Sequence, residues 1–149
     1  AIDVTKTPLP QSTPANPTTP LDPDKLAKIL RGDAQVGDEG VVTVSVSRKH
    51  GVRLGGVYAS PETGISTSIE FKPMGTAGNA AVVPDFSMTA DEVMPVVQRM
   101  QGMGWFQGCL YNQETDEHPQ LYFDHMLKTG DAYALAQEIR TGLDLTDSE

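Results

Sequence analysis

WFQGCLYNQETDEHPQLYFDHMLKTGDAYALAQEIRTGL, which spans residues 105–143, decides the fold. Its pattern predicts, in order, a strand, a loop, a second strand, a turn and a helix, over residues 105–113, 114–119, 120–128, 129–131 and 132–143. Asp131 suits the N-cap position of that helix, and Leu135, Ile139 and Leu143 lie on one helical stripe. Because only a short loop separates the two strands, we expect them to be antiparallel neighbours.

The residues just before this stretch predict one more strand and one more helix. The apolar run 80–88 suits a strand, and Pro84 within it favours an edge position or a bulge, because proline has no backbone N–H to pair. Thr89 and Glu92 have the spacing of a capping box, which opens a helix. From residue 80 the predicted order is therefore β-α-β-β-α.

The segment before residue 80 predicts a short helix and then a meander of strands. Asp22 and Pro23 suit the first positions of a helix, and Gly32 suits its left-handed end. Alternating or apolar runs predict strands over residues 41–49, around 52–58 and over 66–74. The pair Gly55-Gly56 in the second of these strands favours a bulge or a close backbone approach.

These elements predict one domain of the α+β class. We expect a mostly antiparallel sheet, made of the strand meander and the β-α-β-β-α half, with the helices packed on one face. The domain is expected over residues 22–149, and residues 145–149 are expected to be a frayed end. Before the domain, residues 1–21 are expected to form a Pro/Thr-rich extended tail.

The tail has two interpretations, a tether or a segment that contacts a partner. An extended Pro-rich segment loses little entropy when it lies on another protein, which favours partner binding through its prolines, Pro8, Pro10, Pro14, Pro17 and Pro20. The chain begins at Ala1 rather than Met, which is typical of an end left by signal peptidase. We therefore expect an exported, periplasmic or extracytoplasmic protein whose signal peptide has been removed.

Charge and composition exclude several classes of function. The net charge of −9 disfavours nucleic acid and anionic membrane surfaces as partners. No apolar run reaches the roughly 18 to 20 residues of a membrane span. The single cysteine, Cys109, excludes an internal disulfide, and its apolar neighbours predict a small buried side chain rather than a nucleophile.

The chemistry-bearing residues gather on the two predicted strands around the loop. The sequence has no Gly-rich phosphate loop, no paired-cysteine motif and no G-x-S-x-G elbow, so we expect no cofactor and no catalytic residue of a well-marked enzyme class. Tyr111, Asn112, Asp124 and His125 are the candidate ligand-binding residues, because cross-strand pairing can bring them together. Two interpretations of His125 stay open: a buried polar group satisfied by its neighbours, or a residue that binds a metal or a small ligand in a pocket under the sheet.

Residues from about 41 to 145 resemble the LppY/LpqO family of exported bacterial lipoproteins and related proteins, which has no established activity. The motifs that carry the resemblance are GVVTVSVSRKHGVRLGGV (40–57), F-x-P-x-G (71–75), AAVVPDFSMTADEVMPVV (80–97) and QLYFDHMLKTGDAYALAQEIRTGLD (120–144).

The resemblance also implies where this chain departs from the family. The family's central stretch has the form H-N-H, a short loop, P-R and then M-H. Asn112 and His125 match its Asn and its last His, whereas Tyr111 and Gln113 stand at the first two His and Gln120 at the Arg. Tyrosine and glutamine are poor substitutes for imidazole as ligands of zinc or iron. The resemblance thus implies an exported fold whose family-type site is not active here.

Three functions follow as hypotheses. The first is a non-catalytic exported domain that serves as an accessory or structural subunit of a larger cell-envelope assembly, with other protein subunits as its partners. The second is a domain, possibly enzymatic, that binds a metal or small ligand around His125. The third is a stand-alone solute-binding or sensing domain tethered by its tail.

Overall fold

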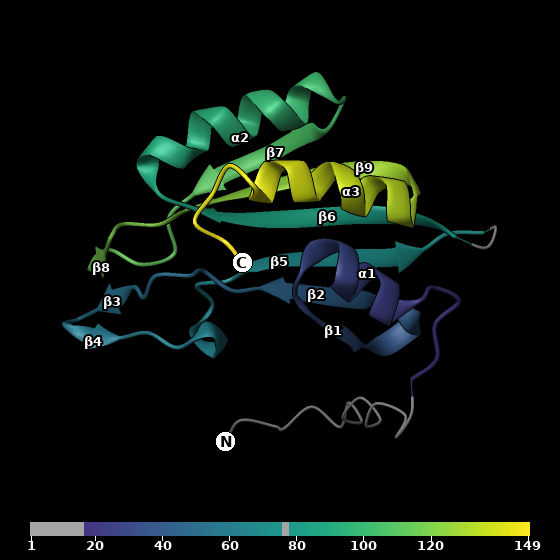
Figure 1. Cartoon of the computed structure of the whole chain (residues 1–149), viewed down its shortest axis with the longest axis horizontal. Helices are drawn as coiled ribbons and strands as arrows, with labels where there is room; N and C mark the ends of the chain where they lie inside the picture. Colours follow the sequence, from purple (N-terminus) through teal and green to yellow (C-terminus); the bar gives the residue numbers. More distant parts are fainter. Residues whose placement is uncertain (1–16, 76–77) are drawn as a thin grey trace, which may run out of the picture.

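A computed structural model describes residues 17–75 and 78–149 of the chain (Figure 1). The helices and strands of these residues follow one another as α1 (Pro23–Leu30), β1 (Asp33–Val36), η1 (Asp38–Gly40), β2 (Val42–Val46), β3 (Arg53–Leu54), β4 (Val57–Tyr58), η2 (Pro61–Thr63), β5 (Thr67–Pro73), β6 (Asn79–Met88), α2 (Ala90–Gly102), β7 (Phe106–Tyr111), β8 (Glu117–His118), β9 (Tyr122–Asp131) and α3 (Ala132–Leu143). Among the described residues, no helix is long and apolar enough to cross a membrane.

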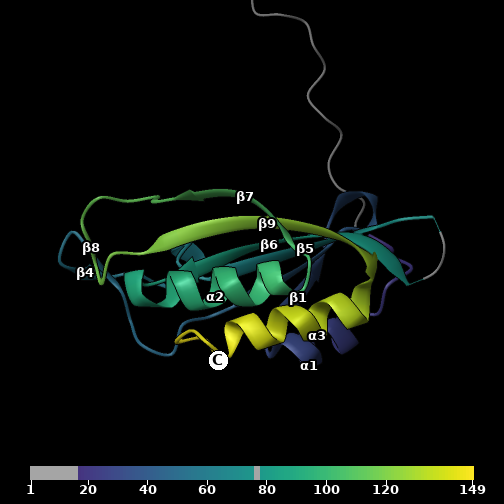
Figure 2. The ribbon, with the colours of Figure 1, turned by 90° about the horizontal axis from the view of Figure 1, so that it is seen from above.

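The main sheet has six strands in the order β1-β2-β5-β6-β9-β7, and every neighbouring pair is antiparallel. A second, small sheet has the order β4-β3-β8. Figure 2 shows α1, α2 and α3 on the same side of the main sheet, so that the other side carries no α-helix of the described residues. The expected fold class, α+β with a mostly antiparallel sheet and helices on one face, is confirmed. We call the helix-free side the open face.

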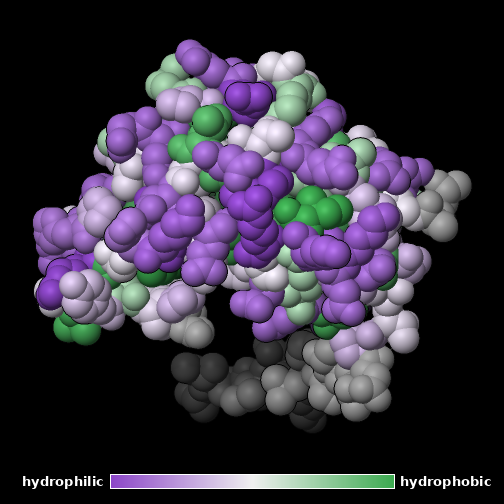
Figure 3. Space-filling model, in the orientation of Figure 1, coloured by the Kyte–Doolittle hydropathy of each residue, from purple (hydrophilic) through white to green (hydrophobic). Residues whose placement is uncertain are grey.

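The main core fills the space between the sheet and the helices. Val42, Val44 and Val46 on β2 are fully buried, while the residues between them are only partly covered. This alternation follows from the two-residue period of a strand and confirms the expected half-buried strand. The helices α1, α2 and α3 pack their apolar stripes against the sheet, so each of these amphipathic elements buries one face. Figure 3 shows that the outer surface over the helices is mostly hydrophilic.

The first helix begins as expected but ends one residue earlier than the sequence suggests. Asp22 caps α1, because its carboxylate accepts a hydrogen bond from the N–H of Lys25 at 3.0 Å. The left-handed residue at the other end is Arg31, with φ 58°, and not Gly32. Gly32 is required for another reason, which is a close approach to β2. A Cβ atom on Gly32 would lie 2.3 Å from the carbonyl oxygen of Ser45.

We expect Gly32→Ala to lower the free energy of unfolding by about 2 kcal/mol, because the added methyl group must displace backbone atoms of β2. Gly37→Ala is the matched control at the other end of β1, where the nearest atom would lie at 3.8 Å. Urea unfolding of both variants gives the measurement. Equal stability of the two variants would show that this close approach does not constrain the fold.

Two expectations about proline and glycine in strands were wrong. Pro84 lies in β6, an interior strand between β5 and β9, and its partner on β5 is Ile69. The pairing of β6 with β9 omits Val83 and Pro84 but keeps its register on both sides, so the sheet tolerates the missing N–H without a bulge. Gly55-Gly56 forms the turn between β3 and β4 rather than a bulge, with positive φ angles, and a Cβ atom added to either glycine would meet no atom within 4 Å.

Other boundaries also differ from the expectation. Residues 129–131 do not form a separate turn but continue β9 as far as Asp131, which caps α3 as expected by accepting from the N–H groups of Tyr133 and Ala134. The segment after α1, for which no strand was predicted, contains β1. This strand was missed because Asp33–Val36 has no clear alternation, and its pairing with β2 defines it.

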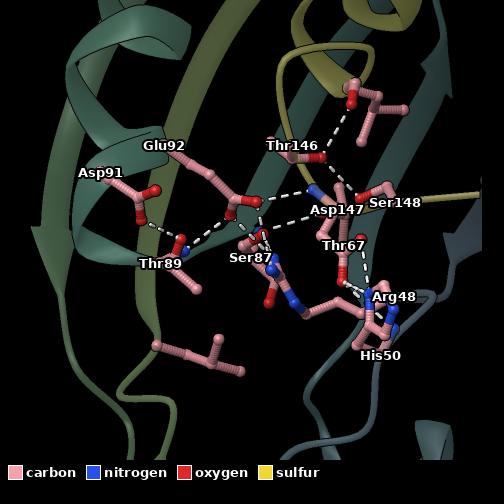
Figure 4. Close-up of polar contacts among 12 residues, drawn as sticks. Arg48, His50, Thr67, Ser87, Thr89, Asp91, Glu92, Thr146, Asp147 and Ser148 are labelled. Atoms are coloured by element: carbon pink, nitrogen blue, oxygen red, sulfur yellow. Dashed lines mark hydrogen bonds and ion pairs between the residues drawn. The ribbon is translucent and has the colours of Figure 1, made fainter.

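The C-terminal residues are held to the domain and are not a frayed end (Figure 4). The side chain of Glu92 on α2 accepts from the N–H of Asp147 at 2.6 Å and from the N–H of Thr89 at 2.7 Å. The same carboxylate forms a two-pronged ion pair with the guanidinium of Arg48, at 3.0 and 3.2 Å. Arg48 also forms a backbone bridge with Ser148. The Glu92 carboxylate thus connects the start of α2, the segment that follows β2 and the C-terminal residues.

The last residues of the expected tail pack against the domain. Leu21 is 5% exposed and belongs to the main core, and the backbone N–H of Asp22 donates to the hydroxyl of Tyr133. Pro17 and Pro20 are described, whereas the other tail prolines, Pro8, Pro10 and Pro14, lie outside the described residues. The prediction that these prolines bind a partner stays a prediction.

Candidate functional site

His125 lies in the middle of β9 and points to the open face of the sheet. Its cross-strand partners are Asp85 on β6 and Cys109 on β7. Asp124, the preceding residue, points to the opposite side of the sheet, as strand alternation requires, and is fully buried there. His125 therefore does not point into the main core, and its side chain is 47% exposed.

Asp85, His125 and Tyr111 form one polar cluster on this face. The Oδ2 atom of Asp85 lies 3.1 Å from Nε2 of His125 and accepts the hydroxyl hydrogen of Tyr111 at 2.8 Å. The rings of Tyr111 and His125 meet edge to face, with centroids 5.6 Å apart. Two residues expected to lie together, Tyr111 and His125, are thus close, and a carboxylate from a third strand connects them.

The cluster borders a small pocket on the open face. The pocket has a volume of about 160 Å³ and is lined by Ser68, Glu70, Val83, Asp85 and His125. The direct cross-strand pairs Ser68–Asp85 and Asp85–His125 form its floor across three strands. Hydroxyl, carboxylate and imidazole groups are therefore available to a small polar ligand, and Val83 offers an apolar contact.

The Asp85 carboxylate is mostly covered, with 17% of its side chain exposed. Its second oxygen, Oδ1, is buried without a hydrogen-bond partner among the described residues. A buried acceptor without a donor costs free energy, so this oxygen marks a place where a donor from a ligand would be favourable. Burial is also the main reason that the pKa of the Tyr111 hydroxyl is raised, with the Asp85 carboxylate adding to the effect.

Asp124 does not join the cluster, because it lies on the helix side of the sheet. Its Oδ2 accepts from the side-chain amide of Gln107 at 3.0 Å, and its Oδ1 has no partner among the described residues. Burial raises the pKa of Asp124 to about 6, and the Asp85 charge across the sheet adds to this rise. Gln101 on α2 in turn donates to Gln107, so Asp124 is the inner end of a hydrogen-bonded chain that runs from α2 through β7 to β9.

Asn112 has a structural contact at the loop that follows β7. Its side-chain amide donates to the carbonyl oxygen of Leu121 at 2.6 Å, which closes the loop before β9. Glu117 lies buried in the same loop, where its carboxylate accepts from the N–H of Leu121, and burial is the main reason that its pKa is raised. Neither Asn112 nor Glu117 lines the pocket beside His125.

Sequence reasoning missed Asp85, Ser68 and Glu70. The one available signal was Asp85 itself, a charged residue in the otherwise apolar run 80–88. The expectation that Cys109 is buried was wrong, because β7 is the edge strand of the sheet and the Cys109 side chain is exposed. Apolar neighbours in the sequence do not ensure burial in this edge strand, because no described strand pairs with β7 on its outer side.

Residues 17–75 and 78–149 contain no group of three or more His, Cys, Asp or Glu side chains that is placed to hold a metal ion. The cluster on the open face holds a partly exposed imidazole, and the Asp85 carboxylate 3.1 Å from Nε2 orients its ring.

A family model described as Domain of Unknown Function (DUF1259) matches residues 24–145. The chain belongs to this family. The match runs from α1 to just beyond α3, so the DUF1259 domain includes the whole sheet, the helices and the cluster around His125. No curated protein and no solved structure matches the chain. The function of this DUF1259 domain must therefore be argued from its own residues.

Proposed function

We propose that this DUF1259 domain is a non-catalytic exported accessory or structural subunit of a larger cell-envelope assembly. The observation that carries the proposal is the edge strand β7, which ends the main sheet. The resemblance to exported LppY/LpqO proteins supports the location, and the His residues that this chain lacks relative to that family's pattern support a non-catalytic role.

The β7 edge has the character of a protein contact surface. Phe106 on β7 is 69% exposed, and its cross-strand partner Leu127 on β9 is 44% exposed on the same face. Leu110, also on β7, is 46% exposed. A free sheet edge with apolar side chains tends to associate with other chains, and proteins usually protect such an edge with charge, proline or a covering segment. The side chains of β7 (FQGCLY) include neither a charge nor a proline.

The charge of the chain indicates the kind of partner. Two copies, each with a net charge of −9, repel one another, so a different protein with a less acidic surface is favoured over self-association. The Pro-rich tail would provide a second contact of the same kind, because an extended segment adds interface at low entropic cost. Together they would give this domain two points of attachment, the β7 edge and the tail.

The test is to isolate the tagged chain gently from its source and to identify the proteins that remain bound to it. We expect fixed companions with wild type, and at least a tenfold loss of them with Phe106→Ser. Met94→Ser is the matched control, because Met94 is an apolar residue that is 58% exposed but lies on α2 and not on β7. A shortened chain without residues 1–16 tests the tail. A wild-type chain recovered alone, or equal binding by both serine variants, would contradict the proposal.

A second candidate function rests on the pocket beside His125, which could hold a small polar ligand. Native mass spectrometry of the same preparation distinguishes the two candidates. A small molecule or metal that stays bound to wild type and is lost in His125→Ala would favour ligand binding. A monomer that carries such a molecule would also favour the stand-alone solute-binding or sensing domain over a subunit role.

A further inference from the structure

A row of polar side chains on the open face crosses five strands of the main sheet. Direct cross-strand pairs connect, in order, Asp33 on β1, Ser45 on β2, Ser68 on β5, Asp85 on β6 and His125 on β9. Direct partners on neighbouring strands share one face of a sheet, so all five side chains lie on the face of His125. With strands roughly 4.8 Å apart, the row is roughly 19 Å long.

A second row lies beside the first. Direct cross-strand pairs connect Gln35 on β1, Thr43 on β2, Glu70 on β5 and Val83 on β6. Each of these residues is two positions along its strand from a member of the first row, so it lies on the same face. The two rows form a floor of hydroxyl, carboxylate and amide groups, with Val83 as an apolar member.

Two pockets lie next to one another on this floor. The first is the pocket beside His125, which includes Ser68. The second has a volume of about 280 Å³ and is lined by Asp33, Gln35, Ser45, Ser47 and Pro61 of η2. Ser45 of the second pocket and Ser68 of the first are direct cross-strand partners, so the two pockets adjoin. We call the two pockets together the open-face groove.

The open-face groove carries negative charge. Its lining includes the carboxylates of Asp33, Glu70 and Asp85, and no Lys or Arg of the described residues lines either pocket. Lys72, two residues after Glu70 on the same strand, is already paired with Glu39. A cleft that is lined by one sign of charge concentrates ions of the opposite sign, so the groove favours a cationic ligand.

The Asp85 carboxylate indicates that this ligand is a hydrogen-bond donor. Its Oδ2 atom accepts from the Tyr111 hydroxyl and lies beside His125, whereas its Oδ1 atom is buried without a donor among the described residues. An ammonium group has three donors and no acceptor, so it matches carboxylate and hydroxyl oxygens. A sugar hydroxyl brings an acceptor as well as a donor and lacks the charge, so it forms weaker hydrogen bonds with a carboxylate.

We propose that the open-face groove binds a linear aliphatic polyamine. One ammonium group pairs with Asp85 and Glu70, and another pairs with Asp33 at the far end of the groove. The methylene groups between them contact Val83 and Pro61, the apolar residues of the lining. The inference rests on the second candidate function, ligand binding, and names the class of ligand. It does not rest on the accessory-subunit role.

The test is isothermal titration calorimetry of the full chain with spermidine at neutral pH and low salt. We expect saturable binding of one spermidine per chain, and weaker binding at higher salt because salt screens exposed charges. Asp85→Asn should weaken the affinity about tenfold and Glu70→Gln about threefold, because each removes a charge-assisted hydrogen bond and Asp85 is the more buried of the two.

The matched control is Asp24→Asn, which removes the same charge from an exposed side chain on α1, on the other side of the sheet (Figure 2). This variant should bind spermidine as wild type does. If Asp85→Asn does not fold, Glu70→Gln carries the test, because Glu70 is exposed. Maltotriose, a neutral probe that offers hydroxyl groups without an ammonium group, should not bind.

Three results would overturn the proposal. They are a folded wild type that does not bind spermidine, an affinity that Asp24→Asn weakens as much as the groove variants do, and binding of maltotriose in place of spermidine. None of them bears on the accessory-subunit role, because that role is tested through Phe106 on β7, which lines neither pocket.

Discussion

Arg48→Met is expected to lower the free energy of unfolding by about 3 to 5 kcal/mol, the largest effect of a single substitution that we foresee. The Arg48 side chain is 3% exposed and that of Glu92 is 12% exposed, so their ion pair is almost completely withdrawn from water. Without the guanidinium, the Glu92 carboxylate would remain buried with an uncompensated charge. The carbonyl oxygen of Ser87, which accepts from Arg48 at 2.9 Å, would lose a donor as well.

Chemical unfolding monitored by circular dichroism measures this loss. Lys72→Met is the matched control, because Lys72 forms an ion pair with Glu39 in which the two side chains are 45% and 78% exposed. Exposed pairs contribute between about 0 and 1 kcal/mol, so this control should change stability little. Replacing both Arg48 and Glu92 by Met and Gln should recover part of the loss, since no buried charge remains. A loss below about 1 kcal/mol for Arg48→Met would show that the cluster of Figure 4 does not anchor the C-terminal residues.

Asp124→Asn is expected to alter how stability depends on pH. The pKa of Asp124 is raised to about 6 in the folded chain from its ordinary value of 3.8, chiefly by burial. Well below pH 4 the carboxyl is protonated in both the folded and the unfolded chain, so its titration no longer changes stability. Between about pH 4 and 6 the unfolded chain releases this proton more readily, so wild-type stability falls as pH rises and stays lower above pH 6.

The asparagine variant lacks this titration. The difference in the free energy of unfolding, variant minus wild type, should therefore rise by about 2 to 3 kcal/mol between pH 4 and 7.5. Any effect of the substitution that does not depend on pH shifts all values equally and leaves this rise unchanged. Denaturant unfolding at several pH values checks this result. The control is Asp33→Asn, because Asp33 is an exposed carboxylate on β1. If the difference in the free energy of unfolding between Asp124→Asn and wild type does not change with pH, burial does not raise the pKa of Asp124 and the prediction is wrong.

Local patterns predicted most of the elements of the fold. The alternation in residues 41–49 and the stripe in 132–143 each report a burial period that depends on few neighbours, so strand and helix were recognised. The caps Asp22 and Asp131 were also predicted, because a capping side chain bonds to backbone groups two or three residues away. Local chemistry failed where the deciding contact is distant in sequence, as at Gly32, which faces Ser45.

The sequence by itself determined the α+β class, the one-sided packing of the helices and the proximity of Tyr111 to His125, because these follow from periodicity and from a short loop between two strands. Only the tertiary structure decided that Asp85 joins them and that Cys109 is exposed. Both depend on strand order. β6 is separated from β9 by a helix and two strands along the chain but lies beside it in the sheet, and no strand of the described residues pairs with β7 on its outer flank. Pairing between distant strands is set by the whole core rather than by local preference, so it is not written in any single stretch.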